Sequence, residues 1–151
     1  MASPGPERAA PPVAFPDFAS PQIAALFSPP GRETAALMRE LRRLVYAAAG
    51  ETPGVGELAE TLKWGEPSYA PKRPRIGSPV RLAARSGGEV AMYFICHTHL
   101  VARFREIYPH CFAFEGDRAL IFWPGAALPG PELRHCIAMA LTFHLRRRSG
   151  G

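Results

Sequence analysis

The chain has 151 residues, of which 47% are apolar, and it carries a formal net charge of +5. This length predicts a single domain with a core large enough for independent stability. No apolar run reaches the roughly 18 residues of a transmembrane helix, and no secretory signal is evident. The three cysteines favour reduced thiols over a disulfide framework, so we expect a cytoplasmic protein with no membrane partner.

The N-terminal residues 1–16 are rich in proline, alanine, serine and glycine. This composition predicts a disordered tail, followed by one domain over 17–148. A short helix is expected from Ser20 to Phe27, because serine is a good N-cap and Pro21 suits the first turn.

Two longer helices are predicted next from apolar residues spaced at three and four positions. The first spans 31–49 and is ended by Gly50, with Arg42 on its polar side; the second spans 54–63 and is capped by Gly65. The two apolar stripes consist of Leu37, Leu41, Leu44, Val45 and Ala48, and of Val55, Leu58, Ala59 and Leu62.

The pattern then changes to the alternation that is typical of strands. The remaining predicted elements are a strand at 80–85, a turn at 86–88, a central strand at 90–95, a helix at 99–108 capped by Thr98, strands around 112–114 and 119–123, and a helix from Pro131 to Arg148. Short turns between strands favour antiparallel pairing. The predicted fold class is therefore α+β, an antiparallel sheet with helices packed mainly on one face.

Several local motifs carry a resemblance to a known family. They are Lys63, Trp64, Gly65, Pro67 and Tyr69, then Met92-Tyr93-Phe94, and the stretch from Tyr108 to Trp123. With these motifs the chain resembles the YdhG-like family, family 1801 of the domains of unknown function. One branch of that family is described as a frataxin-like intracellular iron chaperone. The resemblance implies a cytosolic α+β domain, a monomer or weak dimer, with iron as an alternative cofactor.

The joint after the second long helix is the candidate binding site. It brings together residues with both apolar and polar groups, namely Glu60, Lys63, Trp64 and Tyr69. Aromatic rings with a polar end commonly line ligand pockets. We therefore predict a binding module for a small molecule or a protein partner. The ring of Trp64 is expected to pack on the sheet, while Lys63 and Tyr69 face a shallow cleft.

Other functions remain as alternatives. Cysteine and histidine occur together at Cys96-His97-Thr98-His99, His110-Cys111 and His135-Cys136. No paired CxxC motif accompanies them, so neither a metal site nor a catalytic nucleophile is predicted. Cations at 63, 72, 73, 75, 81 and 85 could contact phosphates, but the absence of a known nucleic-acid-binding motif argues against that partner. A small enzyme of unspecified reaction is the last alternative, without identified catalytic residues.

Overall fold

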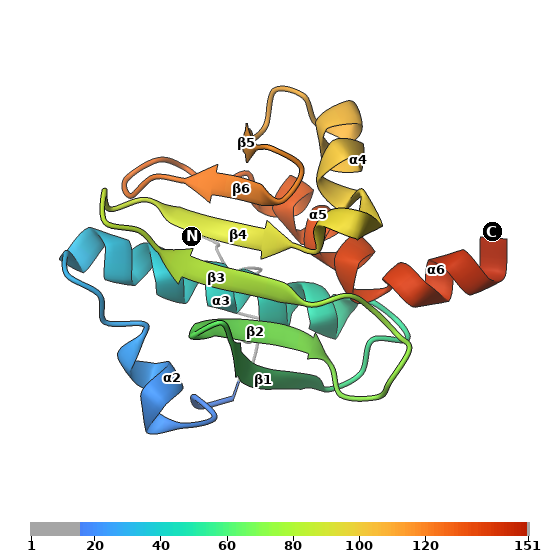
Figure 1. Ribbon diagram of the computed structural model, residues 1–151, viewed down its shortest axis with the longest axis horizontal. Coiled ribbons are helices and arrows are strands. Elements are labelled where there is room, and N and C mark those ends of the chain that lie inside the picture. Colours follow the sequence, from blue (N-terminus) through green and yellow to red (C-terminus); the bar gives the residue numbers. More distant parts are fainter. Residues whose placement is uncertain (1–15, 151) are drawn as a thin grey trace, which may run out of the picture.

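The computed structural model describes residues 16–150, so the predicted tail lies outside the described residues except for Pro16. Six strands form one antiparallel sheet in the order β1-β2-β3-β4-β6-β5 (Figure 1). The strands are β1 Leu58–Lys63, β2 Glu66–Pro71, β3 Val80–Ala84, β4 Val90–Phe94, β5 Ala113–Glu115 and β6 Ala119–Phe122. The architecture confirms the predicted α+β class.

The helices are α2 Pro21–Ala25, α3 Arg32–Glu51, α4 Leu100–Ile107, α5 Gly130–Leu141 and α6 Phe143–Gly150, with a 3-10 turn at Cys96–Thr98. The predicted cap at Ser20 is confirmed, because its hydroxyl accepts a hydrogen bond from the backbone N–H of Ile23 at 3.1 Å. The N-cap of α4 is His99 and not the predicted Thr98, whose hydroxyl accepts a hydrogen bond from the backbone N–H of Leu100 at 3.2 Å. Gly50 does not end α3, which continues one residue beyond it.

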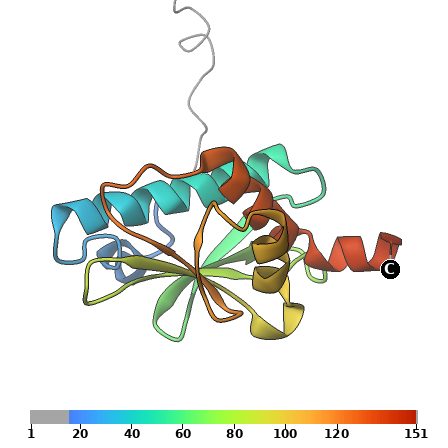
Figure 2. The ribbon, with the colours of Figure 1, turned by 90° about the horizontal axis from the view of Figure 1, so that it is seen from above.

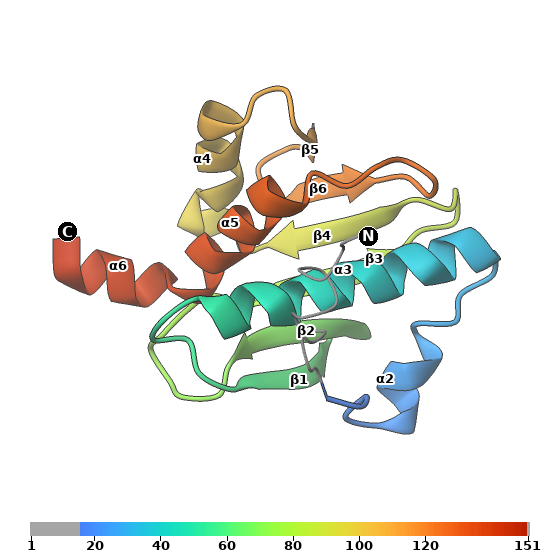
Figure 3. The same cartoon turned by 180° about the vertical axis from the view of Figure 1, so that it is seen from behind.

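Helices α3 and α5 lie across one face of the sheet, and none of the helices within residues 16–150 lies across the other face (Figures 1 and 3). Seen from above, the two helices form a layer over the twisted strands (Figure 2). The core fills the space between these layers. Its largest completely buried side chains include Leu41, Leu82, Met92, Leu120 and Ile137. Alternate residues of β4 show the same division, because Met92 faces this core and Tyr93 faces the open side.

The predicted helix at 54–63 is wrong, because most of this segment forms the edge strand β1. The spacing of Leu58, Ala59 and Leu62 satisfies a helical stripe, yet Leu58 and Leu62 also share one face of a strand. Between them Glu60 lies on the same face. A charged residue at that position hides the alternation that would identify a strand.

The predicted C-terminal helix divides at Thr142 into α5 and α6. The loop at 72–79 occupies the hydrogen-bonding groups at this break. Ser78 donates its backbone N–H to the Ala140 carbonyl at 2.8 Å, and His144 donates its own to the Ile76 carbonyl at 3.0 Å. In a continuous helix the His144 N–H would bond to the Ala140 carbonyl, but here both groups bond to the loop. The helix is therefore interrupted, and α6 projects from the body (Figure 1).

Candidate functional site

The segment singled out in the sequence is a tight β-hairpin. Lys63, the last residue of β1, pairs with Glu66, the first residue of β2, which leaves only Trp64 and Gly65 in the turn. Both have positive φ angles, 55° for Trp64 and 74° for Gly65, as a type I′ turn requires. Gly65 is therefore a turn residue and not a helix cap.

Trp64 occupies a position that ordinarily belongs to asparagine, aspartate or glycine. A bulky side chain with positive φ is a genuine conformational outlier. The side chain also contributes little buried apolar area to the stability of the fold, since 88% of the residue is exposed. The expectation that the Trp64 ring packs on the sheet is therefore wrong.

An apolar cleft of about 520 Å³ opens beside this turn. One wall is the end of α2 with the connection to α3, and the other is the hairpin with β3. Its lining comprises Ala25, Leu26, Ser28, Pro29, Pro30, Met38, Trp64, Gly65, Glu66, Pro67, Leu82, Ala83 and Ala84. Met38 and Leu82 are buried residues of the core, so the cleft reaches down to the core from a rim that includes Trp64.

Glu60 and Tyr69 lie within the hairpin and not at its tip. They are directly opposite each other on β1 and β2, and the Tyr69 hydroxyl donates a hydrogen bond of 2.6 Å to a Glu60 carboxylate oxygen. Arg42 of α3 binds the same carboxylate through two nitrogens, at 2.7 and 3.2 Å. The side chains of this ion pair are only 4% and 3% exposed.

The N-terminal segment completes this buried network. The backbone N–H of Ala19 donates to Glu60 at 2.8 Å, and Arg42 donates to the Pro16 carbonyl at 2.9 Å. The guanidinium also lies 4.4 Å from the centre of the Phe18 ring. The network therefore joins the hairpin, α3 and the first described residues.

Burial and hydrogen-bonding partners determine the protonation states of the acidic groups in this network. Burial raises the pKa of the Glu60 carboxyl, but the hydrogen bonds from Arg42, Tyr69 and Ala19 outweigh it and hold that pKa below its ordinary value. Burial and the Glu60 charge raise the pKa of Tyr69 far above its ordinary value. Burial, with the same charge, raises the pKa of Tyr46 to about 12. Glu60 is thus a stable carboxylate and both tyrosines stay protonated.

The four predicted site residues therefore separate into two pairs. Lys63 and Trp64 are exposed at the hairpin tip, whereas Glu60 and Tyr69 are buried, so Tyr69 does not face a cleft. The sequence pattern does not identify Arg42 as part of this network, because it predicts Arg42 on the polar side of its helix. The signal that could have found it is the unmatched charge of Glu60 between two apolar residues of a strand.

A larger hollow of about 800 Å³ lies between residues 16–21 and α3. The four charged residues that α3 contributes to its wall already have partners within the chain. Arg39 donates to the Phe27 carbonyl at 2.8 Å, Arg43 pairs with Glu40, and Arg42 belongs to the buried network. Arg39 and Arg42 thus hold the segment after α2 and the N-terminal segment against α3.

The cysteine and histidine residues do not converge. Within residues 16–150, no group of three or more histidine, cysteine, aspartate or glutamate side chains could hold a metal ion. Cys96 and Cys111 are exposed and Cys136 is buried, where burial raises the pKa of its thiol to about 12. The Tyr108 hydroxyl instead lies 2.7 Å from Nδ1 of His135.

The basic stretch between 63 and 85 is partly neutralised. Lys72 pairs with Glu57 at 3.1 Å, Arg81 pairs with Glu66, and Arg85 pairs with Glu115 at 2.6 Å. On the open face of the sheet, Arg81, Arg85 and Arg118 surround the ring of Tyr93, at 4.9, 5.7 and 5.1 Å from its centre. Half of the six cations thus have carboxylate partners, which leaves less charge for phosphate contacts.

Comparisons of the chain with protein-family models, with curated proteins and with solved structures find no match. The YdhG-like resemblance therefore stays a prediction. None of the helices in the described part of the chain combines the length and apolar character needed to cross a bilayer.

Proposed function

We propose that the protein is a binding module that holds an apolar segment of a protein partner between Trp64 and the adjacent cleft. The observation that carries this proposal is that Trp64 is both strained and exposed, with φ of 55° and 88% exposure. A backbone outlier of this kind costs about 1–3 kcal/mol and supports a functional hypothesis when the fold gains nothing from it.

The surroundings of Trp64 favour a protein segment over a small molecule. Small-molecule sites enclose most of their ligand, whereas this ring projects from a hairpin tip. Tryptophan is enriched among the residues that dominate binding energy at protein interfaces. Leu62 is also 43% exposed, two residues before the turn. Lys63 adds a positive charge between them, which suits an acidic residue next to the partner's apolar anchor.

Glu60 and Tyr69 have a positioning role in this proposal. Their hydrogen bond, with the ion pair to Arg42, fixes the middle of the hairpin against α3. A rigid base lets the turn present Trp64 without rearrangement, and less ordering on binding leaves more of the contact energy for affinity. Iron binding stays an alternative prediction.

A peptide selection tests the proposal. Random peptides displayed on phage are selected on the wild-type protein, and the enriched peptides are then titrated against purified variants. We expect peptides with an aromatic or large apolar anchor, and a rise in their Kd of about tenfold or more in Trp64→Asn.

The matched control is Trp123→Ala, because Trp123 is the other tryptophan of the chain and is 52% exposed. It should leave the peptide Kd unchanged. If no peptide is enriched, or if the enriched peptides bind the Trp64→Asn variant as tightly as the wild type, the proposal is wrong.

A further inference from the structure

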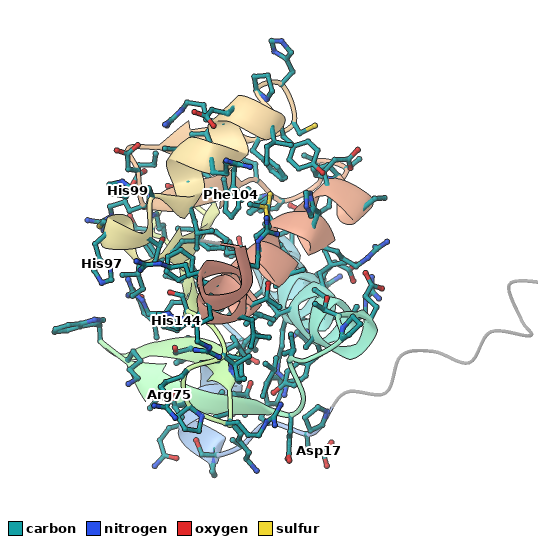
Figure 4. The ribbon with its side chains drawn as sticks, turned by 90° about the vertical axis from the view of Figure 1, so that its right-hand side faces the viewer. Asp17, Arg75, His97, His99, Phe104 and His144 are labelled. Atoms are coloured by element: carbon teal, nitrogen blue, oxygen red, sulfur yellow. The ribbon has the colours of Figure 1, made fainter. Side chains whose placement is uncertain are left out.

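A second hollow, separate from the Trp64 cleft, lies where α4 meets the junction of α5 and α6. It has a volume of about 620 Å³, and its lining includes Thr98, His99, Arg103, Glu106, Arg146 and Arg147. Figure 4 shows this end of the molecule, with His97 and His99 beside the start of α4 and His144 on α6. We call this hollow the basic groove.

The charges around the basic groove are unbalanced. Its lining contains Arg103 and Arg147 but only one carboxylate, that of Glu106. No carboxylate among residues 16–150 forms an ion pair with Arg103 or Arg147. The arrangement differs from that on the open sheet face, where Arg81 and Arg85 each have a glutamate partner. Cations gathered around a hollow attract anions and raise their local concentration.

The floor of the basic groove is apolar. Leu100 and Met139 are buried, and the half-buried ring of Phe143 lies beside them with the Arg147 guanidinium 5.6 Å from its centre. A ligand that fills the groove thus meets positive charge at the rim and apolar atoms below. This pairing of surfaces suits a ligand with an anionic end and an apolar or aromatic body.

We infer that the basic groove binds a small phosphate ester with an apolar or aromatic group. A phosphate group carries close to two negative charges at neutral pH and three acceptor oxygens. Guanidinium groups match that geometry with paired N–H donors, so Arg103 and Arg147 can hold the phosphate from two different helices. The phosphate lies between the arginines, and the apolar group contacts Met139 and Phe143.

Titration with phenyl phosphate, followed by amide chemical shifts in NMR spectra, tests this inference. We expect saturable shifts concentrated at Leu100–Arg103 and Phe143–Arg147. The Kd should rise about fivefold or more in Arg103→Gln and in Arg147→Gln, since each removes one charged contact. All these arginines are exposed, so the variants should keep the wild-type spectrum elsewhere.

Arg105→Gln and Arg148→Gln are the matched controls, because they lie on the same two helices outside the groove lining. Both should bind phenyl phosphate like the wild type, as should Trp64→Asn, which separates this inference from the proposed function. Shifts that do not saturate, phenol binding as tightly as phenyl phosphate, or an equal loss of affinity in the control variants would each overturn it.

Discussion

Glu60 shows how a charged residue can belong to a protein core. Removing a carboxylate from water costs several kcal/mol, and this cost is offset only when the remaining hydrogen-bonding positions are filled. Here the carboxylate accepts two hydrogen bonds from Arg42, one from Tyr69 and one from the backbone of Ala19. Each partner belongs to a different segment, so the pair specifies how those segments meet.

Glu60→Gln should therefore destabilise the protein by about 3 kcal/mol at pH 7, because it leaves the buried Arg42 without its counter-charge. The pH dependence should change too. The folded-state pKa of Glu60 lies below the ordinary value of 4.5, so its contribution is complete above that value and is lost as the pH falls through the folded pKa. Between about pH 5 and pH 3, urea unfolding should show a smaller loss of stability in the variant than in the wild type.

Glu57→Gln is the control for this experiment. The Glu57 side chain is 74% exposed and pairs with Lys72 on the surface, so its loss should change stability by less than about 0.5 kcal/mol. Equal pH profiles for wild type and Glu60→Gln would show that the buried ion pair does not form.

At the scale of elements, the most constrained contact joins the loop at 72–79 to the break between α5 and α6. A Cβ atom on Gly77 would lie 2.1 Å from the carbonyl oxygen of Leu141, which is backbone and cannot rotate away. The close approach explains why Ser78 can reach the Ala140 carbonyl and redirect the chain into α6. Glycine is needed here for space.

Gly77→Ala should consequently lower the free energy of unfolding by about 2–3 kcal/mol through overpacking. Gly50→Ala is the comparison, since a Cβ there meets nothing within 4 Å and the residue is within α3. Alanine should stabilise that helix by roughly 0.5–1 kcal/mol. Thermal unfolding of both variants measures the difference, and a stable Gly77→Ala protein would contradict the described packing.

The elements also show which parts of the structure the sequence predicts. Strands β3, β4 and β6 and helices α3 and α4 follow from local patterns of apolar residues, because each has one side facing the core. Strand β1 could not be predicted in this way, since Glu60 interrupts its buried face and its partner Arg42 is 18 residues earlier. The break at Thr142 depends on bonds to the loop at 72–79, a contact that no local pattern records.

The geometry predicted for the candidate segment is wrong. The sequence pattern predicts Lys63, Trp64 and Gly65 at the end of a helix, with the tryptophan ring packed on the sheet. In the hairpin the same residues form the tip, and Trp64 is directed outward. The difference arises from the type I′ turn, whose first position rarely holds tryptophan and therefore gives no signal for a hairpin.

At the scale of the whole molecule, the two proposed binding surfaces, the cleft beside Trp64 and the basic groove, lie at opposite ends of the sheet. The β1–β2 turn lies at the end near α2, and α6 projects from the opposite end (Figure 1). The proposed protein-binding cleft and the basic groove share no lining residue. Substitutions at distant sites with no shared partner act additively, so each surface can be altered without affecting the other.

The central claim is that Trp64 is kept at the hairpin tip for binding and at the expense of stability. The stability of Trp64→Asn tests it most directly, because asparagine is favoured at this position of a type I′ turn before glycine. We predict that urea unfolding of this variant gives a free energy about 1 kcal/mol higher than that of the wild type, as the backbone strain is relieved. A variant less stable than the wild type by about 1 kcal/mol or more would show that the ring packs as part of the fold, and would contradict the claim.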